Sequence, residues 1–333
     1  MYEAFYGFRE KPFSLLPDPS FLFLSAKHRM ALVLLEYGLM NQAGFTVISG
    51  GIGTGKTTLI RHLLNNLDRD TTVGLISNTH RSFGDLLQWI MLAFKLDDQG
   101  MDKVGRYRAF VDFMIREYAH NRRTVLIVDE AQNMAPETLE ELRMLSNVNA
   151  DKDQVLQVIL VGQPGLRATL RRPDLEQFAQ RIAVDYDLEP LEMHETRDYI
   201  RHRIEVASGD PGLFDEDACA AAHEAGRGVP RLVNLICDTA LVYGYAEQAE
   251  RISAALVREV ARDKRKGGLF PGGEPESPPS PAPREAPPPI APAAVTPVDP
   301  PAAVPRDPRN VLEEAPGSGA EPDSTPDEKK NYQ

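Results

Sequence analysis

A glycine-rich segment constrains the fold of this chain more than any other feature. The letters GGIGTGKTT occupy positions 50–58, directly after the β-branched run Phe45–Ser49 and before an apolar helical pattern. Two glycines separated by four residues, then lysine and threonine, form the spacing of a phosphate-binding loop between a strand and a helix. A turn that only precedes a helix would not need the lysine, the threonine and the strand together. The segment therefore predicts that the chain binds a nucleoside triphosphate.

Each residue type in this segment suits a bound triphosphate. Glycines allow positive φ angles and a close approach of the backbone to an anion. Successive N–H groups and the N-terminus of the following helix then point at the phosphates. Lys56 can reach the β- and γ-phosphates, and the Thr57 hydroxyl can ligate Mg²⁺. The predicted nucleotide-binding residues of the segment are Gly50, Gly51, Ile52, Gly53, Thr54, Gly55, Lys56, Thr57 and Thr58.

Strand and helix patterns alternate through the chain up to about residue 190. The run at 124–128 is continuously apolar and β-branched, as expected for a strand buried on both faces. Parallel strands need crossover connections, so strands separated by helices indicate a parallel α/β sheet. Five strands are predicted, at Phe45–Ser49, Thr72–Ser77, Thr124–Val128, Val155–Val161 and Ala183–Tyr186.

The patterns divide the chain into four parts. Residues 1–45 carry aromatic residues interrupted by prolines, which predicts an irregular arm followed by a helix after Ser25. Residues 46–191 form the α/β nucleotide-binding domain, and residues 192–266 contain only helical patterns, which predicts a small all-α domain. Residues 267–333 are acidic and rich in proline, with few large apolar side chains. They cannot bury enough surface to offset the entropy of ordering, so a disordered tail is predicted.

Composition limits the compartment and the partners. Cys219 and Cys237 are too few for a disulfide framework and are expected to be buried thiols in a reducing compartment. No signal peptide is recognisable, and no run approaches the roughly 18 apolar residues that span a membrane. A cytoplasmic location is expected, and a partner could hold the chain at the inner membrane. The net charge of -12 argues against a broad electrostatic grip on nucleic acid, although a local basic patch could still bind it.

Two carboxylates follow the third predicted strand. Asp129 and Glu130 come directly after the apolar run, and ligands of open α/β sheets bind at the carboxyl ends of the strands. The pair should therefore meet the phosphate loop. Asp129 would hold Mg²⁺ through water, and Glu130 would orient and polarise the attacking water. This pair predicts an ATP hydrolase that cleaves the β–γ phosphoanhydride.

Three further polar residues are candidates for the site. Gln163 ends the fourth strand and could sense the γ-phosphate or hold the nucleophilic water, or simply cap the next helix. Arg181 precedes the fifth strand and could reach the γ-phosphate bound to a neighbouring subunit, or be an ordinary surface arginine. Arg231, in the sequence GVPR, opens a helix of the all-α domain and is suited to reach across to the nucleotide.

Taken in order, these motifs resemble those of the AAA+ ATPases. The phosphate loop and the Asp129-Glu130 pair correspond to the family's Walker A and Walker B motifs. Gln163, Arg181 and Arg231 correspond to sensor 1, the arginine finger and sensor 2. The resemblance implies a five-stranded AAA+ core with a helical lid, ATP and Mg²⁺ as ligands, and hydrolysis in a ring or other homo-oligomer.

The match narrows to the group that resembles general secretion pathway protein A. Its features here are the opening MYEAFYGF, the letters DEAQN at 129–133 and ELRMLSN at 141–147. Within this group the sequence is most similar to the ATPases associated with exosortase (PEP-CTERM) and exopolysaccharide loci. The resemblance implies that hydrolysis drives or regulates the assembly or export of envelope proteins or exopolysaccharide, with that machinery as the partner.

Two other functions share the same motifs. The first is a DNA-transaction ATPase similar to the transposition helpers, in which ATP gates binding to duplex DNA, and a salt-sensitive affinity for DNA would favour it. The second is a nucleotide-gated scaffold that hydrolyses slowly and recruits partners through its tail. Because all three share one set of motifs, the sequence leaves them open.

The aromatic residues of the arm have two alternative roles. In the AAA+ family the segment around Phe13 and the helix after Ser25 lie near the adenine, so the arm could form the base pocket. The same rings could instead cover an edge of the sheet, since aromatic side chains dominate protein cores. His28 is expected to be a surface or packing residue.

Overall fold

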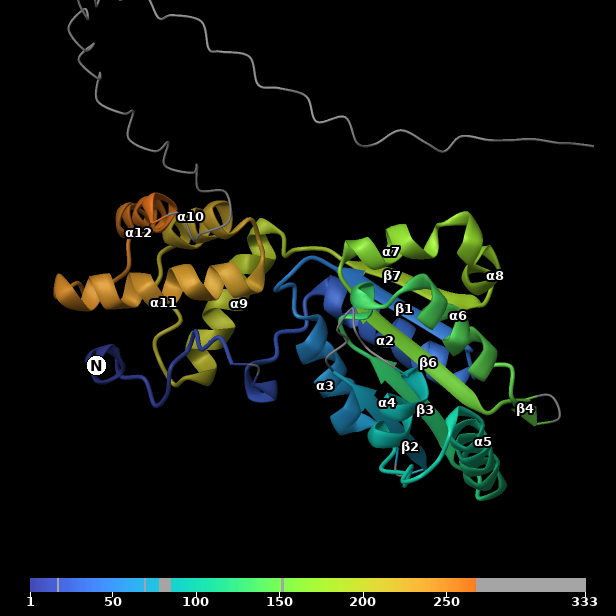
Figure 1. Ribbon diagram of the computed structural model, residues 1–333. Helices are drawn as coiled ribbons and strands as arrows, with labels where there is room; N and C mark the ends of the chain where they lie inside the picture. Colours follow the sequence, from blue (N-terminus) through green and yellow to red (C-terminus); the bar gives the residue numbers. More distant parts are fainter. Residues whose placement is uncertain (17, 69, 78–84, 151–152, 268–333) are drawn as a thin grey trace, which may run out of the picture. The chain divides into compact units, whose positions relative to one another are not determined.

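The computed structural model describes residues 1–16, 18–68, 70–77, 85–150 and 153–267 (Figure 1). The predicted disordered tail lies outside the described residues from position 268 onward. After the gap at 78–84, helix α4 runs from Leu86 to Ala93, and the side chain of Asp85 caps its start by accepting a hydrogen bond from the N–H of Leu87.

A parallel sheet of five strands forms the centre of the fold, in the order β2-β3-β6-β1-β7. Every neighbouring pair is parallel, so the carboxyl ends of all five strands meet at one edge. The predicted α/β class and its five-stranded parallel sheet are confirmed. The strands are β1 (Phe45–Gly50), β2 (Thr71–Ile76), β3 (Arg123–Val128), β6 (Leu156–Gly162) and β7 (Ile182–Leu188).

Helices cover both faces of this sheet because its strands alternate between two apolar clusters. Val125 and Ile127 pack in one cluster with α2 (Ala26–Met40) and α3 (Lys56–Asn66). Leu126 lies in the other cluster, which includes the buried sides of three more helices. Successive residues of a strand point to opposite faces, so one apolar run serves both clusters. These three helices are α4 (Leu86–Ala93), α5 (Lys103–Ala119) and α6 (Pro136–Leu145).

Short elements connect the larger ones. A two-stranded antiparallel pair, β4 and β5, was not predicted, because strands of two residues carry no recognisable periodicity. The short elements are the helices α1 (Tyr2–Tyr6), α7 (Pro164–Leu170) and α8 (Glu176–Ala179), the 3₁₀ helices η1 (Pro19–Phe21), η2 (Ala131–Asn133) and η3 (Pro173–Leu175), and the strands β4 (Asn149–Ala150) and β5 (Asp153–Gln154).

Four helices follow the sheet, in the region where only helical patterns were predicted. Asp215 and Ser253 accept hydrogen bonds from backbone N–H groups at the starts of α10 and α12, which explains where these helices begin. None of the described helices is long and apolar enough to cross a membrane. The helices are α9 (Met193–Val206), α10 (Glu216–Gly226), α11 (Pro230–Ala246) and α12 (Ala254–Lys266). We call this group of helices the lid.

The aromatic rings of the arm lie in the core of the lid. Tyr2, Phe8 and Phe13 are buried in the apolar cluster of α9–α12, and the ring of Phe13 meets that of Phe214 edge-on at 5.8 Å. Of the two alternative roles left open for the arm, covering an edge of the sheet does not describe these three rings. A Cβ atom added to Gly209 would overlap the ring of Phe8, so this glycine of the lid leaves the space that the ring fills.

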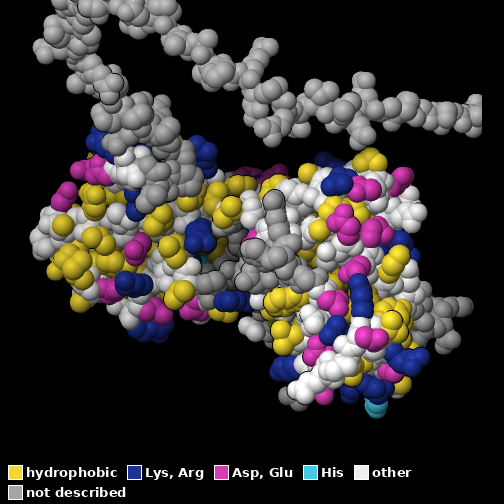
Figure 2. All heavy atoms as spheres, viewed as in Figure 1, with side chains coloured by type: hydrophobic (Ala, Val, Ile, Leu, Met, Phe, Trp, Pro, Cys, Tyr) yellow, Lys and Arg dark blue, Asp and Glu magenta, His cyan; other side chains and the backbone are white. Residues whose placement is uncertain are grey.

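Charges of both signs are interspersed on the surface. Figure 2 shows Lys and Arg side chains lying among Asp and Glu side chains on one face of the molecule. Arg197, for example, lies 2.9 Å from Asp198 and 3.1 Å from Glu216. This face therefore presents mixed charge.

A buried carboxylate of α5 pairs with a partly exposed arginine beside the sheet. Glu117 of α5 is 7% exposed and accepts hydrogen bonds from Arg122 and from the Thr72 hydroxyl of β2. Hydrogen bonds from Arg122 and then Thr72 lower the pKa of Glu117 to about 2, against the opposing effect of burial. The carboxylate thus stabilises the folded state above its unfolded pKa, and this contribution is lost as the pH falls toward 2.

We expect Glu117→Gln to lower the free energy of unfolding by about 1–3 kcal/mol at pH 7, because it removes the charge that Arg122 and Thr72 stabilise. Urea denaturation at pH 7 and at pH 3 measures the effect, which should shrink at the lower pH. Asp174→Asn, in the exposed pair with Arg172, is the control and should leave the midpoint unchanged. An equal loss at both pH values would show that the charge of Glu117 is not the cause.

Candidate active site

The phosphate loop joins β1 to α3 at the carboxyl edge of the sheet. Gly53 and Gly55 have φ angles of 81° and 102°, in the left-handed region that favours glycine. Lys56 begins α3 and is 7% exposed, and its Nζ donates to the carbonyls of Gly50 and Gly51 at 2.8 Å each. Burial lowers the pKa of Lys56, although Glu130 and two aspartates oppose this effect.

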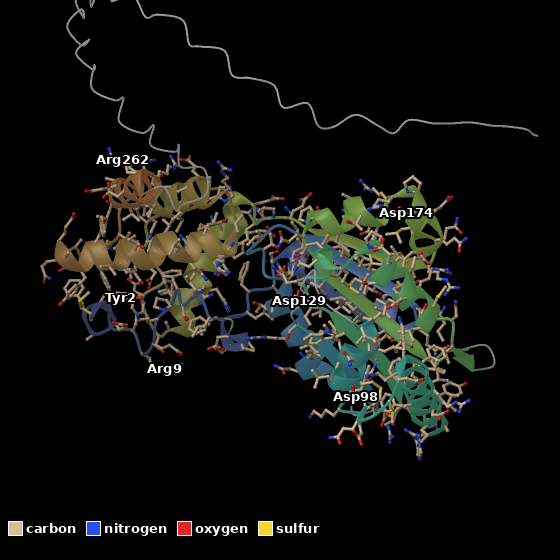
Figure 3. The ribbon with its side chains drawn as sticks, in the orientation of Figure 1. Tyr2, Arg9, Asp98, Asp129, Asp174 and Arg262 are labelled. Carbon is tan, nitrogen blue, oxygen red and sulfur yellow. The ribbon has the colours of Figure 1, made fainter. Side chains whose placement is uncertain are left out.

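The threonine after this lysine meets the first carboxylate of the predicted pair. The Thr57 hydroxyl donates to Oδ2 of Asp129 at 3.0 Å, and Oδ1 of Asp129 accepts from the N–H of Glu130 at 2.9 Å. Figure 3 shows Asp129 at the carboxyl edge of the sheet. No cluster of three or more His, Cys, Asp or Glu among the described residues could hold a metal alone. Two oxygen groups beside a triphosphate do fit Mg²⁺, which takes one or two protein ligands and completes its shell with phosphate and water.

The second carboxylate is held by two amides. Glu130 has a φ of 55°, a left-handed conformation that costs a residue with a Cβ atom about 1–3 kcal/mol and often marks a functional site. Its Oε2 accepts from Nε2 of Gln163 at 3.2 Å and from Nε2 of Gln132. The N–H of Gln163 in turn donates to Oε1 of Gln132 at 2.9 Å. The ends of β3 and β6 are thereby joined through one carboxylate.

Our sequence reasoning gave no role to Gln132. It occupies η2, two positions after Glu130, within the polar run DEAQN. A second amide this close to the predicted water-activating carboxylate was the available signal. Its amide bonds to both Glu130 and Gln163, which makes it the link between two residues that we did predict.

The lid touches the phosphate loop at its predicted arginine. The N–H of Arg231 donates to the carbonyl of Gly53 at 3.3 Å. A Cβ atom added to Gly53 would lie 2.6 Å from Cβ of Arg231, so the two backbones approach closely only because residue 53 is glycine. A cavity of about 230 Å³ lies beside this contact. Its lining includes Ile52, Gly53, Gly55, Lys56, Thr57, Thr58, Glu130, Gln163 and Arg231.

Arg181 lies elsewhere in the chain's own fold. Its Nη1 donates to the Ser146 hydroxyl at 3.2 Å and to the carbonyl of Arg143 at 3.5 Å, at the C-terminal end of α6. It is not among the residues that line the cavity. The sequence predicted that it acts on the nucleotide of a neighbouring subunit, and that role stays a prediction.

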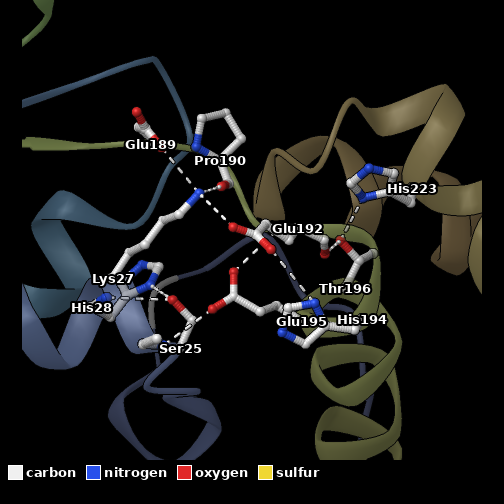
Figure 4. Close-up of polar contacts among 11 residues, drawn as sticks. Ser25, Lys27, His28, Glu189, Pro190, Glu192, His194, Glu195, Thr196 and His223 are labelled. Carbon is white, nitrogen blue, oxygen red and sulfur yellow. Dashed lines mark hydrogen bonds and ion pairs between the residues drawn. The ribbon is translucent and has the colours of Figure 1, made fainter.

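The N-terminus of α2 contacts the phosphate loop and the residues around the start of the lid. Figure 4 shows its contacts with residues 189–195. His28 is 4% exposed; its Nδ1 bonds to the Ser25 hydroxyl at 2.8 Å and its Nε2 to the carbonyl of Thr54 at 3.0 Å. Burial lowers the pKa of His28 and favours the neutral ring. Glu195 of α9 accepts from the N–H of Ala26 at 3.1 Å. His28 is buried, as a packing residue would be, but its contact with the loop was not foreseen.

Lys27 ties the same helix to the segment before the lid. Its Nζ lies 3.1 Å from a carboxylate oxygen of Glu189 and 3.6 Å from one of Glu192 (Figure 4). It also donates to the carbonyl of Pro190 at 3.2 Å. One turn of α2 therefore holds the loop, through His28, and the start of the lid, through Lys27.

The arm contributes the remaining wall of the cavity. Leu22 and Phe23 line it together with Tyr199 of α9, and the rings of Phe23 and Tyr199 meet edge-on at 5.8 Å. This lining is apolar and aromatic, which suits the base of a nucleotide. Of the two alternative roles for the arm, the base pocket is the one that this geometry favours.

Comparison with known proteins agrees with these features. Residues 39–170 match the family model described as AAA domain. The chain is 40% identical over 255 residues to General secretion pathway protein A from Aeromonas hydrophila, which covers 76% of this chain and 46% of that protein. The chain thus spans about half the length of this relative.

Two solved structures have a similar fold. The Aeropyrum pernix ORC2 protein in its ADPNP-ADP complexes has a TM-score of 0.58 at 17% identity, over 77% of this chain and 72% of that one. Cdc6p from Pyrobaculum aerophilum has a TM-score of 0.56 at 17% identity, over 74% and 71%. At such identities the likeness shows the fold alone, which is the α/β P-loop fold of an AAA domain.

The close contact at Gly53 gives a testable expectation. Gly53→Ala should destabilise the protein by about 1–2 kcal/mol for its positive φ, plus about 1–3 kcal/mol for overlap with Arg231. Gly100→Ala is a matched control, because Gly100 has a φ of 71° and nothing lies within 4 Å of an added Cβ atom. Urea denaturation measures the free energy of unfolding of both variants, and the difference between their losses isolates the cost of overlap with Arg231. Equal losses would mean that the lid does not rest on the loop at this point.

Proposed function

We propose that this chain, which carries an AAA domain of the P-loop type, binds and hydrolyses ATP. The observation that carries the proposal is the meeting of Lys56, Thr57, Asp129 and Glu130 at one edge of the sheet. A lysine on a glycine-rich loop, a hydroxyl beside a carboxylate, and a second carboxylate held by amides are the groups that phosphoryl transfer to water requires.

In this proposal each residue has a separate task. The loop's N–H groups and Lys56 hold the phosphates, and Thr57 and Asp129 hold Mg²⁺, which neutralises charge on the phosphates when it is bound. Glu130 orients the attacking water and accepts its proton. The hydrogen bonds from Gln132 and Gln163 fix the orientation of the Glu130 carboxylate for this task. Gln163 lies close enough to Glu130 to contact the same water.

Two arginines extend the proposal beyond one active site. Arg231 lies where the lid contacts the phosphate loop, so a change in the bound phosphates would alter the position of α11. Arg181 would supply positive charge to the γ-phosphate of an adjacent copy in a homo-oligomer. In this arrangement hydrolysis moves the lid and depends on a neighbour.

We infer that hydrolysis serves the assembly or export of envelope proteins or exopolysaccharide, from the cytoplasm or at the inner membrane through a partner. The relative named for a secretion pathway, at 40% identity, supports this over a DNA-transaction ATPase. The archaeal structures, at 17% identity, support only the fold. Binding to duplex DNA at two salt concentrations tests the choice, because a steep salt dependence would favour the DNA alternative.

Two substitutions test ATP hydrolysis directly. Lys56→Ala should abolish ATP binding, because it removes the ammonium group that the loop holds for the β- and γ-phosphates. Glu130→Gln should still bind ATP, yet its turnover should fall by about 10²- to 10⁴-fold, as expected for loss of a general base. Equilibrium binding and steady-state phosphate release measure the two effects. If Glu130→Gln hydrolysed ATP at the wild-type rate, Glu130 would not be the water-activating residue.

The link through Gln132 predicts a smaller effect on the same step. Gln132→Leu should keep ATP affinity within about threefold while lowering turnover about tenfold, because Glu130 loses one of its two amide donors. Phosphate release under saturating ATP measures the turnover. Asn133→Ala, at the neighbouring position of η2, serves as the control, and an equal loss in both variants would point to η2 as a whole rather than to Gln132.

A further inference from the structure

Three buried polar residues of the lid form a chain of hydrogen bonds that ends at the nucleotide cavity. Arg203 and Tyr199 lie on α9 and Asn234 lies on α11, and each is only 6 or 7% exposed. All three line the cavity that the phosphate loop also lines. None of them belongs to the sequence motifs that predicted the site, so their role needs a separate account.

Arg203 is held by neutral acceptors. Its Nε donates to the carbonyl of Pro12, and its Nη2 donates to that of Ser14 at 3.3 Å. Its guanidinium carbon lies 4.7 Å from the centre of the Phe21 ring. The guanidinium forms no ion pair within the described ranges of the chain. Through these hydrogen bonds Arg203 holds the arm against α9, next to the part of the arm that lines the cavity.

The direction of the next hydrogen bonds follows from the chemistry of arginine. A guanidinium can only donate, so the Tyr199 oxygen accepts from Nη1 of Arg203 at 3.1 Å. The single proton of Tyr199 then needs an acceptor, because a buried donor left unpaired is costly. The one in reach is Oδ1 of Asn234, at 2.8 Å. Burial raises the pKa of Tyr199, so this proton stays in place.

This order fixes which way the Asn234 amide turns. Its oxygen faces Tyr199, so its nitrogen is left as a donor at the cavity. Among the described residues Nδ2 of Asn234 donates no hydrogen bond to protein. Asn234 follows Arg231 by one turn of α11, and the rings of Tyr199 and Phe23 line the same cavity. A neutral donor beside aromatic rings suits the uncharged acceptors of a sugar or base, whereas the cations Lys56 and Arg231 suit the phosphates.

We propose that Asn234 donates a hydrogen bond to the nucleoside part of the bound nucleotide, and that Arg203 and Tyr199 are positioning residues that set its orientation. The inference rests on the proposed nucleotide binding. With this hydrogen bond, the lid contacts the sugar or base of the nucleotide as well as its phosphates. It also couples that contact to the arm, because the same Arg203 holds Pro12 and Ser14.

Calorimetric titration with ADP and with pyrophosphate, both in the presence of Mg²⁺, tests the proposal. Asn234→Ala should weaken ADP binding about threefold to tenfold, the worth of one neutral hydrogen bond, and leave pyrophosphate binding within twofold. Asn234→Asp keeps the shape and the acceptor for Tyr199 but cannot donate, so it should show a selective loss of ADP too, and it decides the matter if the alanine variant fails to fold.

Tyr199→Phe tests the orientation. It removes the hydroxyl that faces Oδ1, so the amide can turn over and ADP affinity should fall by a smaller factor than in Asn234→Ala, again without loss for pyrophosphate. Thr239→Val is the control on the same helix, because the Thr239 hydroxyl donates only to the carbonyl of Leu235. It should leave both affinities unchanged.

The outcomes separate this inference from the proposed function. If the wild type bound neither ADP nor pyrophosphate, the proposed nucleotide site itself would be wrong. If the wild type bound ADP but the Asn234 variants matched it, or lost ADP and pyrophosphate equally, the contact with the nucleoside would be overturned while nucleotide binding stood.

Discussion

The burial of one ammonium group is the constraint on which the site depends. Lys56 is nearly inaccessible, so its charge must be met by protein groups, and the carbonyls of Gly50 and Gly51 together with the nearby carboxylates meet it. The loop that carries these carbonyls bends through Gly53 and Gly55, whose positive φ angles favour glycine. The carboxylates are near because parallel strands end at one edge of the sheet. The glycine-rich loop, the parallel direction of the strands and the acidic pair thus together stabilise the buried charge of Lys56.

The loop is also a meeting point for segments far apart in the chain. His28 reaches it from α2, and Arg231 reaches it from α11. Lys27 and Ala26, beside His28, bond to the segment that leads into the lid and to the lid itself. Helix α2 and the lid therefore contact adjacent residues of the loop, Thr54 and Gly53. In the proposed function, this is what would let a change in the phosphates alter the lid.

Much of this arrangement could be predicted from local sequence, and the rest could not for a physical reason. The five strands followed from apolar, β-branched runs, and the phosphate loop followed from a fixed spacing. Gln132, His28 and Arg203 were missed because their roles come from contacts between distant positions, which no local pattern encodes. The sequence left the role of the arm open for the same reason: aromatic rings indicate burial, but the lid residues that they contact, such as Gly209 and Phe214, lie about two hundred residues later.

The packing of the arm into the lid makes the lid a domain of two separated pieces of sequence. Its core needs Tyr2, Phe8 and Phe13 from the beginning of the chain and four helices from after the sheet. During synthesis the aromatic piece leaves the ribosome first and has no partner until the whole α/β core has followed it. The lid can therefore fold only after the core has been made, which gives the chain a fixed order of assembly and leaves the first residues as the last to be buried.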